Sequence, residues 1–207
     1  MAAGICLGAV ALLLLFALLI GPLPFAWDRA VMLALRTPGD LGRPVGPPGL
    51  LPFMRDLTAL GGGRLLTLIV VAVAGLLVAR RLYLPALLTV LASWSGGQIV
   101  ALVKQHVGRA RPDIVPRLIE VGEMSFPSGH AASSAVVYLT LAALGTQAVR
   151  ERRVRAYLLA CAVLLVGTIG ISRVYLGVHW PTDVLAGWSF GTLWALGWWR
   201  LGAAVRR

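Results

Sequence analysis

The chain carries little charge and almost no lysine. Charged residues make up 13% of its 207 positions, and Lys104 is the only lysine among 19 basic residues. A typical soluble domain is about 25% charged. The scarcity of charge, together with 58% hydrophobic residues, excludes an ordinary soluble protein. The mean hydropathy of +0.84 instead indicates a protein embedded in a membrane.

Acidic residues are also scarce, at eight, which leaves a formal net charge of +11. A basic excess can indicate nucleic-acid binding, but this chain has no soluble basic face and no interleaved aromatic platform. We therefore expect no nucleic-acid partner. In a membrane protein, arginines anchor the cytoplasmic loops against anionic lipid, and we interpret the basic excess in that way.

Cysteine occurs only twice, at Cys6 and Cys161, and both lie inside apolar runs. Thiols in such places usually pack as small hydrophobic groups, so we expect neither a disulfide nor a cysteine metal site. The chain is expected to need no metal and no cofactor. It shows no internal repeat or low-complexity tract, and its length suits one compact domain over residues 1–207.

Six apolar segments reach or approach the length that crosses a bilayer, which is about 20 residues. They cover residues 2–20, 57–79, 82–103, 131–148, 156–171 and 184–199. The first segment lacks a basic flank and a small-residue cleavage site, so we expect a retained helix rather than a signal peptide. The predicted fold is all-α: a polytopic membrane protein with six transmembrane helices in a single bundle.

Arginines mark one side of this bundle. They occur in residues 80–81, 150–155 and 200–207, and all three regions fall on the same side of a six-helix arrangement. The positive-inside rule makes that side the cytoplasm and places both termini there. Residues 21–56 then lie outside. Within them, residues 26–36 have apolar positions at helical spacing and form either an amphipathic interface helix or a simple connector.

The outer ends of the last four segments hold most of the residues that are suited to chemistry. Charged groups near a membrane are costly, so their clustering indicates function. Fixed cations and the unpaired amides at a helix start are the groups that bind a tetrahedral phosphate. Ser128 fits a helix N-cap, and Gly129 lets the backbone approach a ligand closely. The predicted phosphate-binding residues are Lys104, Arg111, Ser128, Gly129 and Arg173.

Two histidines divide the catalytic roles. His179 is the better nucleophile because Asp183 lies four residues on, in the first turn of a helix that starts near Pro181. That carboxylate would fix the imidazole tautomer and stabilise a cationic phosphohistidine. His130 then serves as the general acid, and later as the base that activates water. The predicted catalytic residues are therefore His179, His130 and Asp183.

Taken singly, these residues have simpler interpretations. A lysine at a helix end often extends to the interface, a lone arginine after a helix often sets topology, and a Ser-Gly pair often just begins a helix. These simpler interpretations explain the whole set less well, because charges that only set the topology should gather on the cytoplasmic side and not on the outer side. His106, Arg109 and Arg117 in the same outer loop fit a solvated loop, and we leave them out of the site.

Three motifs resemble the signature of the type-2 phosphatidic acid phosphatase superfamily, the lipid phosphate phosphatases. They are K-x6-R-P from Lys104, P-S-G-H from Pro127 and S-R-x5-H-x3-D from Ser172, and every position is matched. The resemblance implies a metal-independent phosphatase with an outward-facing site. It gives the phosphate-binding and catalytic residues predicted above the same roles.

Residues 172–187 are similar to the same stretch of bacterial undecaprenyl-diphosphate and phosphatidylglycerophosphate phosphatases. This likeness implies a multi-pass protein of the bacterial inner membrane. The expected substrate is a lipid phosphate or diphosphate, with undecaprenyl diphosphate favoured and phosphatidylglycerophosphate or phosphatidic acid next. The expected partners are this substrate and the membrane lipids, with no obligate protein partner.

Two alternatives stay open. Soluble relatives with this signature are acid phosphatases or vanadium haloperoxidases, although six apolar segments argue against both. A transporter or channel of phosphorylated lipids would use the cations as a recognition site. Transport does not explain a paired His179 and Asp183, or a second histidine at a helix start. Loss of phosphate release with retained substrate binding in His179→Ala would distinguish catalysis from transport.

Overall fold

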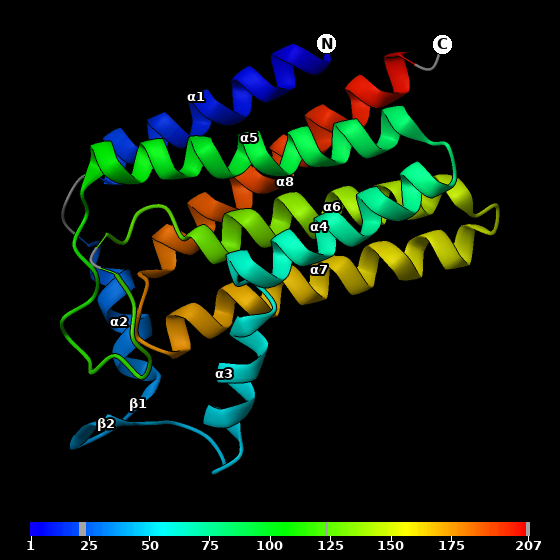
Figure 1. Ribbon diagram of the computed structural model, residues 1–207. Coiled ribbons are helices and arrows are strands. Elements are labelled where there is room, and N and C mark those ends of the chain that lie inside the picture. Colours follow the sequence, from blue (N-terminus) through cyan, green and yellow to red (C-terminus); the bar gives the residue numbers. More distant parts are fainter. Residues whose placement is uncertain (21–23, 123, 206–207) are drawn as a thin grey trace.

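Long helices lying side by side form most of the computed structural model, which describes residues 1–20, 24–122 and 124–205 (Figure 1). Among these residues, α1, α5, α6 and α7 are each long and apolar enough to cross a bilayer, and α3 and α4 are so only if the two helices are taken together as a bent pair. The chain is thus a predominantly helical, multi-pass membrane protein. The long helices are α1 (Ala2–Ile20), α4 (Gly63–Ala79), α5 (Tyr83–Val107), α6 (Gly129–Ala148), α7 (Arg152–Tyr175) and α8 (Pro181–Val205).

Shorter elements connect α1 to α4. Residues 26–36 form the helix α2 (Ala26–Ala34) and then enter strand β1 (Arg36–Thr37). β1 pairs with the antiparallel strand β2 (Asp40–Pro44), and the helix α3 (Leu50–Ala59) follows. Of the two interpretations of residues 26–36, a helix is therefore present, but it ends at Ala34.

The predicted second segment, residues 57–79, is wrong at its start. α3 ends at Ala59, and α4 begins at Gly63 after a bend of 48°. The cause is the glycine run 61–63, because glycine loses the most conformational freedom in a helix. Gly62 has extended backbone angles as the N-cap of α4. The bend turns α3 away from the axis of α4, so that residues 50–79 form two helices and not one.

Helix α7 is longer than the predicted segment 156–171, since it runs from Arg152 to Tyr175. Arg173 therefore stands in the last turn of this helix and not after it. Helix α8 begins at Pro181, as predicted. Cys6 and Cys161 are both free thiols.

The two ends of the bundle differ. Figure 1 shows both termini at one end, together with the links from α4 to α5 and from α6 to α7. Helix α2, the loop that follows α5, and the link from α7 to α8 lie at the opposite end. The helix ends that carry the predicted site residues are at this second end.

Helices α6 and α8 pack with their backbones nearly in contact. A Cβ atom at Gly187 would lie 2.8 Å from the carbonyl oxygen of Ser128, and one at Gly191 would lie 2.6 Å from that of Ala132. Small residues commonly permit such close packing in lipid, where burial of apolar surface drives association only weakly. Because the contact begins at Ser128, it fixes the start of α6 against the first turns of α8.

Replacing Gly191 with alanine is expected to force α6 and α8 apart, because the new Cβ would lie 2.6 Å from the Ala132 carbonyl oxygen and the Ala135 Cβ. Overpacking of this kind costs about 1–3 kcal/mol of unfolding free energy. The measurement is unfolding of the purified protein in detergent. Gly167→Ala is the matched control, since a Cβ there meets no described atom within 4 Å. Equal stability of the two variants would contradict the close packing.

Candidate active site

The predicted site residues lie where four helices meet the loops at one end of the bundle. Lys104 is in the last turn of α5, and Ser128 is the N-cap of α6. Arg173 is in the last turn of α7, and Asp183 is in the first turn of α8. Each position follows from where a helix starts or stops, so the helix ends bring together residues far apart in the sequence.

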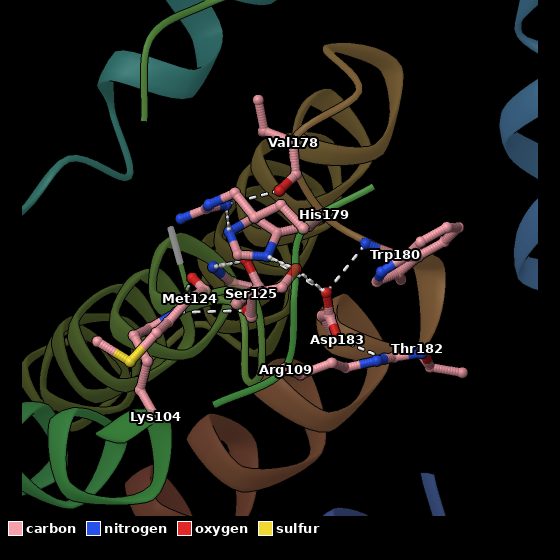
Figure 2. Close-up of polar contacts among 12 residues, drawn as sticks. Lys104, Arg109, Met124, Ser125, Val178, His179, Trp180, Thr182 and Asp183 are labelled. Carbon is pink, nitrogen blue, oxygen red and sulfur yellow. Dashed lines mark hydrogen bonds and ion pairs between the residues drawn. The ribbon is translucent and has the colours of Figure 1, made fainter. Parts of the chain in front are cut away.

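The His179 imidazole lies between a carboxylate and a guanidinium. Its Nδ1 lies 3.5 Å from Asp183 Oδ2, a neighbour that Figure 2 shows beside the ring. Its Nε2 lies 3.0 Å from a terminal nitrogen of Arg111. A carboxylate at Nδ1 favours the tautomer protonated there, which leaves a lone pair on Nε2. The predicted contact between His179 and Asp183 is thus confirmed.

The surroundings of His179 also keep its imidazole uncharged at neutral pH. Its pKa is lowered to about 3, chiefly by burial; Asp183 raises it, while Arg111 and Arg173 lower it further. The imidazole is therefore neutral at pH 7, as an attacking nitrogen must be. Burial, followed by the charge of Arg117, lowers the pKa of Arg111 to about 10. Arg111 still carries its positive charge at neutral pH.

The start of α6 offers an open place for an anion. The Ser128 hydroxyl accepts a hydrogen bond from the Ala131 amide at 3.5 Å, which confirms the predicted N-cap. A Cβ atom at Gly129 would meet no described atom within 4 Å, so space remains in front of its backbone. The first amides of a helix have no partner within the helix and attract anions. An anion can thus approach the backbone of α6 directly.

Three cations surround this place, and each is held by uncharged groups. The Lys104 ammonium donates to the carbonyl oxygens of Met124 and Ser125 at 3.1 and 3.3 Å. Arg173 donates to the Thr58 hydroxyl of α3 at 2.9 Å, and its buried Nε has no hydrogen-bond partner among the described residues. Arg111 donates to the Val178 carbonyl oxygen at 2.6 Å. These cations keep positive charge available for an anion.

His130 lies in the first turn of α6, half-buried, beside the break between α3 and α4. A Cβ atom at Gly61 would lie 3.3 Å from the His130 ring. The Ser128 amide just before it donates to the Asp183 carbonyl oxygen at 3.0 Å. This hydrogen bond ties the start of α6 to the start of α8, and so keeps both histidines at the same end of the bundle.

The interpretation of Arg109 as a solvated-loop residue is wrong. Its side chain is fully buried and donates to Asp183 Oδ1 at 2.6 Å, to the Thr182 hydroxyl at 2.8 Å and to Asp28 Oδ2 at 3.3 Å. The sequence did indicate this burial. Arg109 is two residues before Arg111, and alternate residues of an extended segment point to the same side. Arg109 therefore lies on the same side as Arg111. By contrast, Arg117 is exposed in the loop, as expected, and His106 is exposed but lies in the last turn of α5 and not in the loop.

Two further polar contacts escaped the sequence analysis. The Ser125 hydroxyl donates to Asp183 Oδ2 and lies 3.4 Å from His179 Nδ1. Thr58 reaches Arg173 from a helix 115 positions earlier in the chain. Serine and threonine are too common for either one to stand out without the fold.

The sequence model of the PAP2 superfamily matches residues 82–207, which is more than half of the chain. The chain belongs to the PAP2 superfamily. The resemblance drawn from the three motifs is thus confirmed. This PAP2 protein is a phosphatase of the membrane-spanning kind.

This PAP2 protein is similar to several lipid phosphatases. It is 36% identical over 150 residues to phosphatidylglycerophosphatase B of Bacillus subtilis, across 70% of this chain and 72% of the relative. It is 30% identical over 150 residues to decaprenylphosphoryl-5-phosphoribose phosphatase of Mycobacterium tuberculosis, across 71% and 77%. The crystal structure of a PAP2 type phosphatidylglycerolphosphate phosphatase from Bacillus subtilis matches with a TM-score of 0.77 at 28% identity, over 97% of this chain and 95% of that chain.

Acidification is expected to destabilise the fold through His179. An unfolded histidine titrates near about 6.5, while folded His179 stays neutral down to about 3. The stability that neutral His179 contributes is fully present above the unfolded pKa and is lost as the pH falls toward the folded one, because the unfolded chain binds the proton more readily. The unfolding temperature of His179→Gln in detergent should therefore fall less than that of the wild type between about pH 7 and pH 5. Equal decreases would contradict a buried neutral imidazole.

Proposed function

We propose that this protein hydrolyses the terminal phosphate of a membrane lipid phosphate or diphosphate through a phosphohistidine at His179, without a metal ion. The observation that carries the proposal is the neutral, buried imidazole held between Asp183 at Nδ1 and Arg111 at Nε2. A nucleophile, an orienting carboxylate and a cation beside the attacking atom are the groups that an attack on phosphorus needs. A phosphate arriving at Arg111 would take over its hydrogen bond and free the Nε2 lone pair.

The reaction has two displacements at phosphorus. First, His179 Nε2 attacks phosphorus and the bond from phosphorus to the lipid oxygen breaks, while His130 donates a proton to that oxygen. Then His130 removes a proton from water as the water attacks phosphorus, the nitrogen–phosphorus bond breaks and inorganic phosphate leaves. Lys104, Arg111 and Arg173, together with the Ser128 hydroxyl and the Gly129 amide at the start of α6, stabilise the charge on the phosphoryl oxygens.

An apolar groove beside the site supports a lipid substrate. A cavity of about 390 Å³ lies between α4, α5 and α6, and Ser133 on its wall lies one helical turn after His130. Val71 and Trp94 on its rim are 62% and 63% exposed, so the cavity opens sideways toward the bilayer. A lipid tail lying there would leave its phosphate near the start of α6. Its apolar walls include Leu66, Val70, Val90 and Val137.

The relatives suggest which lipids to test. One is named for phosphatidylglycerophosphate, one for a decaprenyl-linked phosphate, and one, 33% identical over 70 residues, is an undecaprenyl-diphosphatase of Sulfolobus acidocaldarius. All three names describe a phosphate on a long apolar tail. We propose this shared chemistry for the substrate. The first two lipids to test are undecaprenyl diphosphate and phosphatidylglycerophosphate, and phosphatidic acid follows. The first is favoured by the likeness of residues 172–187, and the second is named in the 36% identical relative.

We also propose six membrane spans and an outward-facing site within one domain, residues 1–207. The spans are α1, the bent pair α3 and α4, then α5, α6, α7 and α8; the last has 25 residues, which is long enough to cross. Both termini lie at the same end as the arginine-bearing residues 80–81 and 150–155 (Figure 1). The positive-inside rule puts that end in the cytoplasm of a bacterial cell, and the site on the outer face of its inner membrane.

Phosphate release from this lipid panel should survive excess EDTA and be abolished in His179→Ala. Loss of a nucleophile that acts with a general acid typically lowers kcat by about 10³-fold or more. His106→Ala is the matched control, since that histidine is exposed at the end of α5. It should release phosphate at the wild-type rate.

The outcomes of this experiment separate the possible functions. Loss of activity in EDTA would refute the metal-free mechanism. Full activity of His179→Ala would refute the role of His179 as the nucleophile. No release from any lipid by folded wild-type protein would make transport of phosphorylated lipids the better explanation. The order of rates in the panel would identify the lipid class.

The effect of His130→Ala should depend on the leaving group. General acid catalysis contributes about 10²–10⁴-fold, and a poor leaving group needs it most. The leaving group of phosphatidylglycerophosphate is the alkoxide of phosphatidylglycerol unless it is protonated, whereas that of undecaprenyl diphosphate is undecaprenyl phosphate, a stable anion. We therefore expect a larger loss of kcat/KM for phosphatidylglycerophosphate, because kcat/KM reports the first displacement and not the later hydrolysis of the phosphohistidine, which is common to both lipids. Equal losses of kcat/KM would contradict proton donation to the leaving oxygen.

A further inference from the structure

A buried chain of charges extends from the nucleophile to the short helix α2. Asp183 Oδ1 accepts from Arg109 at 2.6 Å, and a second nitrogen of Arg109 lies 3.3 Å from Asp28 Oδ2 in the first turn of α2. All three side chains are fully buried. Burying three charges is expensive, so an arrangement of this kind indicates a purpose beyond packing.

The geometry divides the Asp183 carboxylate between two tasks. Oδ1 pairs with Arg109, while Oδ2 faces His179 Nδ1 and accepts from the Trp180 amide at 3.0 Å (Figure 2). Arginine and carboxylate commonly pair through two parallel hydrogen bonds. Such pairing here would occupy both oxygens of Asp183 and take Oδ2 from His179.

Asp28 opposes that two-point pairing. It draws one nitrogen of Arg109 toward α2, so that a different nitrogen of the same guanidinium meets Asp183. Asp28 also accepts from the Thr182 amide and hydroxyl at 2.9 Å each, which fixes the carboxylate on the first turn of α8. The Trp180 ring lies 5.8 Å from the guanidinium carbon and limits its movement from another side.

We propose that Asp28 and Arg109 are positioning residues for the His179 nucleophile, acting through Asp183. The proposal rests on the function proposed above, in which His179 attacks phosphorus. Arg109 keeps the Asp183 carboxylate charged and rotated so that Oδ2 faces Nδ1, and Asp28 keeps Arg109 from taking both oxygens. Helix α2, which bears exposed Trp27 and Val31 on its apolar side, thereby becomes part of the catalytic apparatus.

The test uses Asp28→Asn, which keeps the shape and removes the charge, and Arg109→Lys, which keeps the charge and removes the planar fork. Arg29→Gln is the matched control, because Arg29 is an exposed neighbour on the same helix. Two readouts are taken from detergent-purified, full-length protein. One is kcat and KM for release of phosphate from phosphatidic acid, and the other is the ¹⁵N NMR tautomer of His179 without substrate.

Both site variants should lower kcat by roughly 10²-fold, as small misplacements of reacting groups do, with KM little changed. Both should also reduce the fraction of His179 protonated at Nδ1, and Arg29→Gln should alter neither readout. In the double variant, Asp28→Asn should add little to the loss of kcat that Arg109→Lys causes alone, because both residues act through the same contact with Asp183. A purely structural role would lower the unfolding temperature without changing kcat per folded molecule or the tautomer.

Folded variants with wild-type kcat and wild-type tautomer would overturn the proposal. If Arg109→Lys does not fold, Asp28→Asn decides alone, since asparagine can still accept from Thr182. The tautomer readout needs no turnover, so it distinguishes failure of this proposal from failure of the proposed function. An inactive wild type with a tautomer that depends on Asp28 would refute the phosphatase mechanism and retain the positioning network.

Discussion

The site depends on one buried carboxylate, that of Asp183. A charge inside a membrane protein is tolerated only when its oxygens are fully satisfied, and here the partners come from several elements. Arg109 and Ser125 reach it from the loop after α5, and His179 reaches it from the link between α7 and α8. Its own carbonyl oxygen holds the Ser128 amide at the start of α6. The residue whose carboxylate contacts His179 therefore also holds together the segments that form the candidate site.

The distribution of charge around Asp183 explains why this end of the bundle suits a phosphate. The buried carboxylates of Asp28 and Asp183 are matched by Arg109. Lys104, Arg111 and Arg173, in contrast, donate to carbonyl and hydroxyl oxygens and not to carboxylates in the contacts described. Their positive charge is therefore available to an anion at the open start of α6. His179 lies between the two sets, with Asp183 at Nδ1 and Arg111 at Nε2.

The sequence predicted most where a contact depends only on the spacing of residues at the start of one helix. Apolar runs located the long helices, and the four-residue separation of His179 and Asp183 predicted their contact, because it depends only on where α8 begins. Burial of Arg109 could not be deduced in the same way. Its partner Asp28 lies 81 positions away on a helix whose placement depends on tertiary packing. The glycine run 61–63 indicated the break before α4. We nevertheless predicted one continuous segment over residues 57–79, because the residues on both sides of the glycines are mostly apolar.

In the proposed mechanism, His179 carries the phosphoryl group between the two displacements. The most direct measurement is rapid mixing of the protein in EDTA with a lipid phosphate labelled with ³²P at its terminal phosphate, followed by an alkaline quench. We expect a label on the protein that is stable in base and labile in acid, located in the peptide that contains His179 and formed before phosphate is released. Phosphate released at the full rate with no label on the protein would mean that water attacks the lipid phosphate directly, and would contradict a phosphohistidine intermediate at His179.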